Sequence, residues 1–390
     1  MKTVLLNWSG ARYDWFSYLN NIFKVKLKEL GFEPIIIEVP QSDDKVPDFL
    51  KKIKDYKTKV VFSHSGIGAD VHIPIQNGLS VNFFETNNII IFILHGDHPW
   101  HNMKAHSLDV ENCLHIYPSK VFYDAANIFC PKKYAKNVYI PFPLLADDKK
   151  IDKRQGEFFV LIKDYFNDEH FLKKNSDKFN ILFYYEKIKK ETVVRLKNEG
   201  YFEHIRFIFE FTKKFQLDKI FNKETLVSFY AHVDFYLRTL KAELICNKIE
   251  FPLHVYGNGW TDFTSHNKKI KFFPGKKLKQ SQELFYSEFG IIDISPTDGL
   301  HDRSQRALIN ETLFMTYSNK NSLPVDKPNA IESLIYNFVD NNLNERCEFI
   351  LNNQKEVIES VKYLKECWLN ERSWNKFLLN LLSLIDKNKS

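Results

Sequence analysis

The chain has 390 residues, of which 44% are hydrophobic, and it carries a formal net charge of +6. This length exceeds one ordinary core, so two domains are expected, and the hydrophobic fraction excludes a chain that is disordered throughout. The lysines are scattered along the sequence, which argues against a nucleic-acid binder, because such proteins concentrate basic residues on one face. A basic balance suits anionic small substrates or an acidic membrane surface.

Cysteine usage and hydropathy predict the compartment. The five cysteines lie far apart and form no Cys-x-x-Cys pair, which is typical of reduced thiols in the cytoplasm. The opening MKTVLLNWSGARYDW turns polar too early for a secretory signal, and the apolar run at 89–94 is too short to span a bilayer. We expect a cytoplasmic protein, with peripheral contact at the inner face of the cell membrane permitted by its charge.

Strands and helices alternate through the first part of the chain. Helical patterns cover 15–31, which ends at Gly31, and 46–56. Short apolar runs predict strands at 2–8, 34–39, 59–64, 89–96, 113–119 and 137–143. This alternation predicts a parallel sheet, and ligands bind at the carboxyl ends of the strands in such sheets.

The polar stretch at 144–157 is predicted to join two domains. We place an N-terminal domain at 1–147 and a C-terminal domain at 158–370. The part at 158–225 shows no clear motif and is interpreted as an insertion. The last segment, 371–390, is predicted to be a helix that packs back on the N-terminal domain.

The alternation resumes in the second half. Strands are predicted at 251–260, 269–276, 290–296 and 313–319. Helices are predicted at 225–248, 280–290 and 302–313. The tail from Pro328 on is predicted to be helical, with amphipathic stretches at 332–343 and 374–385.

The segment SPTDGLHDRSQRALINE, residues 295–311, stands where a buried strand leads into a helix. Such a junction can bind an anion, because the first helical N–H groups are unpaired and the helix dipole is positive there. Arg303 is suited to pair with a phosphate, His301 to donate to the phosphate or to a sugar hydroxyl, and Asp302 to cap the helix. On spacing alone, a purely structural reading, in which Asp302 only caps and Arg303 only meets a neighbouring acid, is equally good.

The order of motifs in the second half resembles that of a known family. Arg238 on a helix is followed by VYGNGW, FFPGK, ELFYSEFGIIDISP, GLHDRSQRAL and LFMTYSN. This order is similar to that of the C-terminal domain of the CgeB-like glycosyltransferases, over about Tyr236 to Asn319, and ILHGDHPW resembles a segment of their N-terminal half. The resemblance implies an α/β protein of the GT-B fold, in which two Rossmann-like domains with extra helices face each other across a cleft.

The resemblance also implies a nucleotide-sugar site in the C-terminal domain, with no metal or other cofactor. Its donor-binding residues would be Gly257, Gly259, Trp260, His301, Asp302 and Arg303. Many GT-B enzymes carry a ribose-binding glutamate about three residues after this arginine, where the chain has Arg306. Glu311 stands where glycine is common. These departures leave the nucleotide open.

The N-terminal half is the expected acceptor side. Loops after its strands place Ser9, Gly10, His64 and Trp100 as acceptor-binding residues, and Asp97 or His98 as the general base. A metal site at His95, Asp97 and His98 is disfavoured because the three side chains are too close in sequence for one tetrahedral site. The structural alternative is that Asp97 caps a turn and Trp100 fills the core.

The expected function is transfer of a sugar from a nucleotide-sugar donor to a hydroxyl of a glycan, a lipid-linked glycan or a protein. One alternative is a catalytically inactive GT-B protein for binding or assembly, which the missing glutamate motivates. Another is a sugar-nucleotide enzyme such as an epimerase, because one fold hosts several chemistries.

Overall fold

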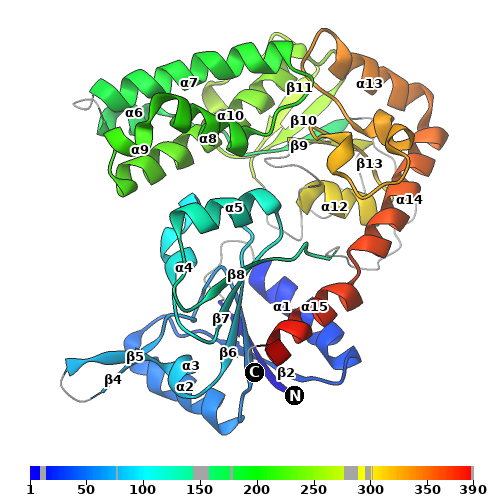
Figure 1. Cartoon of the computed structure of the whole chain (residues 1–390). Helices are drawn as coiled ribbons and strands as arrows, with labels where there is room; N and C mark the ends of the chain where they lie inside the picture. The colour runs from blue at the N-terminus through cyan, green and yellow to red at the C-terminus, as the bar shows by residue number, and fades with distance from the viewer. Residues whose placement is uncertain are drawn as a thin grey trace. The chain divides into compact units, whose positions relative to one another are not determined.

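The computed structural model describes residues 1–8, 15–75, 78–143, 158–175, 179–275, 289–294, 300 and 302–387. The chain divides into two compact units (Figure 1). Unit 1 comprises Met1–Pro143 and Arg372–Ser390, and unit 2 comprises Leu144–Glu371. Each unit is described by itself.

Unit 1 is built on a six-stranded sheet in which every neighbouring pair is parallel. Its strand order is β2 (Glu33–Glu38), β1 (Lys2–Asn7), β3 (Val60–His64), β6 (Ile90–Leu94), β7 (Cys113–Tyr117) and β8 (Lys136–Tyr139). Each of these strands lies in an apolar run from which the sequence predicted it.

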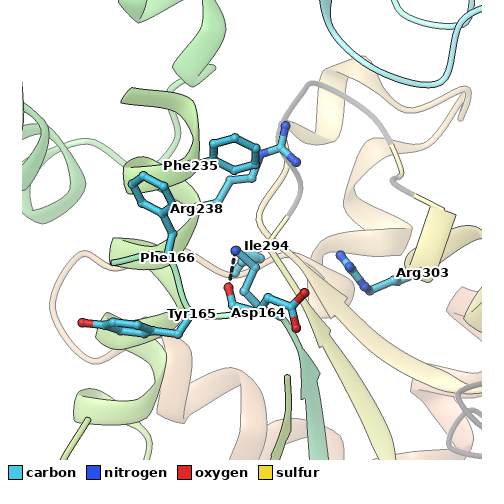
Figure 2. Close-up of a pocket in the computed structure, with 8 residues that line it drawn as sticks. Asp164, Tyr165, Phe166, Phe235, Arg238, Ile294 and Arg303 are labelled. Carbon is cyan, nitrogen blue, oxygen red and sulfur yellow. Dashed lines mark hydrogen bonds between the residues drawn. The ribbon is translucent and has the colours of Figure 1, made fainter. Parts of the chain in front are cut away.

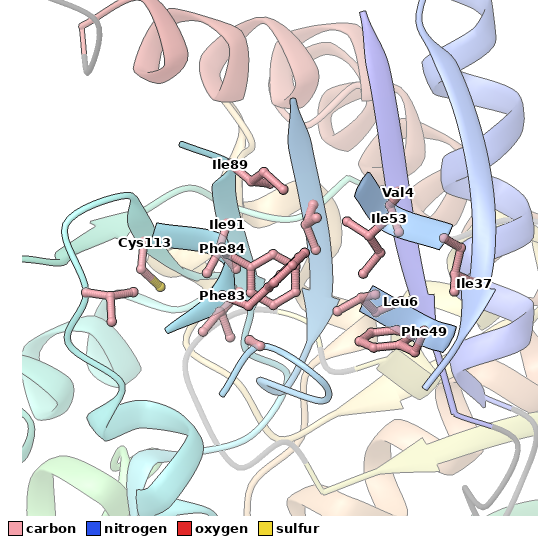
Figure 3. Packing of buried hydrophobic residues seen from close by; sticks show 14 of the residues in the cluster. Val4, Leu6, Ile37, Phe49, Ile53, Phe83, Phe84, Ile89, Ile91 and Cys113 are labelled. Carbon is pink, nitrogen blue, oxygen red and sulfur yellow. The ribbon is translucent and has the colours of Figure 1, made fainter. Parts of the chain in front are cut away.

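Both faces of this sheet are covered. Along β1, Val4 and Leu6 belong to one apolar cluster and Leu5 to another, because successive side chains of a strand point to opposite faces. Figure 3 shows Val4 and Leu6 gathered with Ile37 of β2 and with Phe49 and Ile53 of the next helix. Such two-sided burial explains why the strands are continuous apolar runs.

The helices of unit 1 are α1 (Trp15–Glu29), α2 (Val46–Asp55), α3 (Phe83–Thr86), α4 (Met103–Ser107), α5 (Lys120–Phe129) and α15 (Trp374–Lys387). The 3₁₀ segments are η1 (Asp43–Lys45) and η3 (Pro99–His101), and a hairpin joins β4 (His72–Pro74) to β5 (Ser80–Asn82). The sequence did not predict α3, α4, α5 or the hairpin.

Helix α15 supplies part of the core of unit 1 although it comes from the end of the chain. Figure 1 shows it beside α1, and the ring of Phe23 on α1 meets Trp374 at 4.9 Å between centroids. Phe377, Leu378 and Leu381 of α15 are buried in the same cluster as Leu5.

Unit 2 is built on a five-stranded parallel sheet. Its strand order is β11 (Ile270–Phe273), β10 (Leu253–Tyr256), β9 (Phe159–Ile162), β12 (Gly290–Asp293) and β13 (Leu313–Thr316). The central strand β9 was not predicted. It opens the part at 158–225, so the beginning of that part belongs to the core of the sheet.

The helices in the described part of unit 2 are α6 (Glu169–Lys174), α7 (Phe179–Asn198), α8 (His204–Phe215), α9 (Leu217–Ile220), α10 (Lys223–Lys248), α12 (Asp302–Ile309), α13 (Asn342–Asn352) and α14 (Gln354–Glu371). The 3₁₀ segments are η4 (Trp260–Asp262), η5 (Lys320–Ser322) and η6 (Pro328–Leu334). In Figure 1, α7, α8 and α10 lie alongside one another. The predicted helix at 302–313 ends at Ile309, and the one at 280–290 lies almost wholly outside the described residues.

The tail predicted to be helical from Pro328 on is helical in α13 and α14, but the stretch 332–343 is not one continuous helix. Its first residues belong to η6, and the chain then runs extended, with Ile335 bridging to Thr316 of β13. Leu334, Tyr336 and Phe338 are buried in alternation, and the Tyr336 hydroxyl donates to the Asp293 carbonyl at 3.0 Å. Packing against the sheet therefore overrides the local helical pattern. Within the described part of the chain, no helix has the length and hydropathy needed to cross a membrane.

Candidate functional site

A cavity of about 270 Å³ lies at the carboxyl edge of the sheet of unit 2. The edge is a ligand site in parallel α/β sheets, because strand ends, loops and helix N-termini converge there. Strand β9 ends just before the wall residues 163–166, β12 just before Ile294, and α10 and α12 contribute the rest. The lining residues are Lys163, Asp164, Tyr165, Phe166, Phe235, Arg238, Ile294 and Arg303.

The wall of this cavity is positively charged. Figure 2 shows Arg238 on α10 and Arg303 on α12 reaching toward it from different elements, with Asp164 between them. Burial, together with the charges of Arg238 and Arg303, lowers the pKa of Lys163 to about 8. A concave surface that holds three cationic side chains is suited to bind a polyanion such as a diphosphate.

Backbone contacts with the end of β10 fix the loop that carries Lys163. The Trp260 indole Nε1 donates to the Lys163 carbonyl at 2.6 Å, and the Tyr165 N–H donates to the Asn258 carbonyl at 2.8 Å. A Cβ added at Gly257 would lie 2.0 Å from the Lys163 oxygen. Glycine is therefore required at 257 for the two backbones to approach this closely.

The predicted donor-side residues occupy two different places. Arg303 lies in the cavity wall. Gly257, Gly259 and Trp260 contact the 163–165 loop and do not line the cavity. Trp260 is only 4% exposed. His301 and the side chain of Asp302 lie outside the described residues. Their roles stay predictions.

Sequence reasoning missed much of the cavity wall. Lys163 and Asp164 directly follow β9, so recognising FFVLI as a strand would have drawn attention to them. Arg238 was noted in the motif order but was not assigned to the site. Phe235, one turn before it, carried no sequence signal beyond its place on a long helix.

Arg306 and Glu311, which depart from the CgeB-like pattern, have different surroundings. Arg306 is buried, 8% exposed, on α12. Glu311 has a left-handed backbone with φ of 50°, the conformation that glycine adopts most readily, and its carboxylate accepts a hydrogen bond from Lys365 at 2.8 Å.

On the acceptor side, His64 ends β3 and belongs to a buried polar network. Its Nε2 lies 3.1 Å from Asn20 Oδ1, Asn20 Nδ2 donates to Asn7 Oδ1 at 3.2 Å, and Asn7 Nδ2 donates to Glu38 at 2.7 Å. Burial lowers the pKa of His64 to about 4, so the ring is neutral. The network joins the carboxyl ends of β1, β2 and β3. Ser9 and Gly10 lie outside the described residues.

The loop after β6 separates the two candidate bases. Asp97 is exposed, whereas His98 is buried and its ring contacts Trp100 at 3.3 Å between centroids. Trp100 is 4% exposed and also meets Phe129. The burial of Trp100 is what the packing alternative describes.

Behind this loop, three histidines form a buried cluster. His95 Nε2 lies 2.8 Å from His115 Nδ1, His95 and His106 stack at 3.7 Å, and His106 Nδ1 lies 3.1 Å from the Tyr117 hydroxyl. Burial lowers the pKa of His106 and His115 to about 3, and that of His95 well below its usual value. Among the residues that the structure describes, no three His, Cys, Asp or Glu side chains are arranged to hold a metal ion.

No protein-family model and no curated protein sequence matches the chain. Among solved structures, the chain is similar to sucrose-phosphate synthase from Thermosynechococcus elongatus, with a TM-score of 0.52 and 10% identity, over 99% of this chain and 98% of that one. It is also similar to Anabaena HepE, solved in complex with UDP-glucose, with a TM-score of 0.49 and 10% identity, over 99% and 100% of the two chains. The match to the synthase spans nearly all of both chains and agrees with the two parallel α/β units. The chain therefore has the GT-B fold.

Proposed function

We propose that the chain is a nucleotide-sugar-dependent glycosyltransferase that binds its donor in the cavity of unit 2. The observation that carries the proposal is the placement of Lys163, Arg238 and Arg303 around one cavity at the carboxyl edge of a Rossmann-like sheet. The sucrose-phosphate synthase that shares the fold supports this class of activity. On the motif order, we assign the chain to the CgeB-like glycosyltransferases.

In this proposal the three cations stabilise the leaving nucleoside diphosphate. Negative charge grows on the diphosphate as the bond between its oxygen and the anomeric carbon of the sugar breaks, and fixed cationic groups stabilise such charge without reorganisation. No metal or other cofactor is required for this role.

The acceptor is a hydroxyl of a glycan, a lipid-linked glycan or a protein, and unit 1 is its proposed binding side. Asp97 is the better candidate for the general base than His98, because its carboxylate is exposed while the His98 ring is buried against Trp100. We place this reaction in the cytoplasm, with peripheral contact at the cell membrane.

The second candidate is a GT-B binding protein without turnover. It is favoured by Arg306, which stands where many GT-B enzymes carry a glutamate and is buried in α12. Release of a nucleoside diphosphate from any nucleotide sugar would exclude it.

A thermal-shift panel of UDP, GDP, ADP and CMP tests the donor site. One nucleotide is expected to raise the melting temperature of the wild type by several degrees, because a ligand that binds only the native state stabilises it by mass action. Arg303→Ala should lose most of that shift. Arg195→Ala, on α7 in the same unit and paired with Glu199, is the matched control and should keep it. Equal shifts in wild type and Arg303→Ala, or no shift with any nucleotide, would contradict the donor site.

The affinity for this nucleotide should fall as the pH rises from 7 to 9. The pKa of Lys163 is lowered to about 8, so its amine is protonated and positively charged below that pH and neutral above it. Loss of one charge-assisted contact should weaken binding roughly fivefold. Calorimetric titrations at several pH values measure the effect. Lys163→Arg, which stays charged throughout, should flatten the profile, and an equally steep profile in that variant would rule out Lys163 as the titrating group.

A further inference from the structure

A chain of buried hydrogen bonds runs from Arg238, in the cavity wall, into the core of unit 2. Arg238 Nε and Nη2 donate to the two oxygens of Asp234 at 3.1 and 2.7 Å. The same carboxylate meets His204 Nε2 at 2.5 Å, and His204 Nδ1 lies 3.3 Å from Lys241 Nζ. The chain joins α10 to α8.

Burying this network costs folding free energy, which suggests that it serves a purpose beyond packing. Asp234 and His204 are fully buried and Lys241 is 1% exposed, and burying charged groups carries a desolvation penalty that apolar side chains would avoid. Its member nearest the surface is Arg238, which is also the member that borders the cavity. The network therefore ends at the proposed ligand site.

The geometry fixes the guanidinium of Arg238 in one orientation. Two of its five N–H groups are bound side-on to Asp234, which sets both the direction and the plane of the group. His204 in turn has one tautomer, because Lys241 donates to its Nδ1 and leaves Nε2 to donate to Asp234. Burial lowers the pKa of His204 to about 4, so the ring is neutral. The acids Glu203 and Asp293 are the further charged groups that act on Lys241.

We infer that Asp234 and His204 are positioning residues, which hold the Arg238 guanidinium in the orientation that meets the phosphate groups of the ligand. The inference rests on the proposed function of the cavity. It assigns part of the affinity for phosphate to two residues that do not themselves line the cavity.

Asp234→Asn separates positioning from simple electrostatics. Removing a negative charge beside the cavity makes the site more positive, so charge alone predicts tighter binding of an anion. Positioning predicts weaker binding. Asparagine replaces one of the two accepting oxygens with an NH2 group, so the Arg238 guanidinium loses one of its two hydrogen bonds. We expect Asp234→Asn to bind inorganic pyrophosphate, and the nucleotide that stabilises the wild type in the thermal-shift panel, about five- to tenfold more weakly than the wild type in calorimetric titrations.

A double-mutant cycle shows whether the effect passes through Arg238. Arg238→Ala should weaken binding about tenfold or more. In the Arg238→Ala background, Asp234→Asn should change the affinity less than about twofold, because the group it positions is gone. Asp168→Asn, the same charge change at the Lys189 pair of unit 2, is the control and should leave binding near wild type.

His204 provides a second variant if Asp234→Asn is too unstable to titrate. His204→Gln keeps a donor to Asp234 and should retain most of the affinity, while His204→Phe removes the donor and should weaken binding to the level of Asp234→Asn. Melting temperatures of the free variants show whether each one folds.

The outcomes are distinct for the two proposals. If the wild type binds the ligands and Asp234→Asn binds them as well or better, the positioning role is wrong while the donor site stands. The same holds if Asp234→Asn is as damaging with Arg238→Ala as without it. If the wild type binds pyrophosphate but no nucleotide, the donor proposal fails, and the pyrophosphate cycle still decides the role of Asp234. If the wild type binds neither, both proposals fall.

Discussion

Gly257→Ala is expected to displace the loop that carries Lys163 and to abolish ligand binding in the cavity of unit 2. The added methyl group would lie 2.0 Å from the Lys163 oxygen, 2.5 Å from its carbonyl carbon and 2.9 Å from the Asp164 nitrogen. All three are backbone atoms, so no side-chain rotation relieves the overlap. We expect a loss of about 3 kcal/mol or more in the free energy of unfolding. Urea denaturation and titration with pyrophosphate measure the two effects.

Alanine substitutions at two other glycines of unit 2 serve as comparisons for this loss of stability. Gly200→Ala meets only the Asn337 amide, at 3.8 Å, and should stay within about 0.5 kcal/mol of the wild type. Gly259→Ala meets the Tyr165 oxygen at 3.0 Å with φ of 85°, so its cost should be intermediate, about 1–2 kcal/mol. If Gly257→Ala were as stable as Gly200→Ala, the close approach of the two backbones would be disproved.

Unit 1 is expected to unfold on mild acidification. In the unfolded chain, His64, His95, His106 and His115 take up protons below their ordinary pKa of about 6.5. In the folded chain, burial lowers the pKa of each far below that value. The unfolded state therefore binds more protons, and stability is present above pH 6.5 and falls as the pH drops toward the folded pKa values. Each histidine should cost about 2 kcal/mol at pH 5 relative to pH 7.5.

The hydrogen bonds of the histidine cluster independently indicate that protonation destabilises the folded state. His115 Nε2 donates to the Leu108 carbonyl at 2.8 Å, so its Nδ1 accepts from His95 Nε2. A proton added to His115 would place two donors face to face. A proton added to His95 Nδ1 would be buried with no acceptor among the described residues. At about 2 kcal/mol for each histidine, the combined loss of stability is comparable to the roughly 5–15 kcal/mol that stabilises a typical domain.

Hydrogen exchange of β6 and β7 peptides at pH 7.5 and 5.0, corrected for the intrinsic rates, measures the effect within unit 1. Replacing His106 with phenylalanine removes one titrating group and should reduce the pH dependence. Tyr117→Phe removes the hydroxyl that contacts His106 but no histidine, so it should lower stability at both pH values and keep the slope. Equal protection at both pH values in the wild type would refute the role of the cluster.

Prediction from sequence succeeded where one local pattern decides the structure. Strands such as Ile90–Leu94 are short, wholly apolar runs. Arg303 was chosen because a strand leads into its helix, and it lies in the cavity wall, while its role in donor binding stays a prediction. The pattern of 332–343 was helical, but contacts of Tyr336 with the sheet decided its conformation. Asp234 and His204 are separated by 30 positions, and Trp260 and Lys163 by 97, so no window of sequence could pair them.

The glycine pair after β10 shows the limit of a motif. From the resemblance, Gly257 and Gly259 were expected to bind the donor. At Gly257 the space is filled by the chain itself, at the carbonyl of Lys163, and the residues that line the cavity are on the loop that this contact holds. The sequence predicted a special backbone at this point but not what approaches it.

The position of α15 in the chain has a consequence for synthesis on the ribosome. Unit 2 is one continuous segment, Leu144–Glu371, whereas unit 1 is interrupted by it and takes Phe377, Leu378 and Leu381 from beyond it. Domains generally fold as they emerge, so the sheet of unit 1 leaves the ribosome first but lacks part of its cover until α15 follows. In the meantime its apolar face is open to chaperones and to other nascent chains. The first unit to be translated is thus the last to be completed.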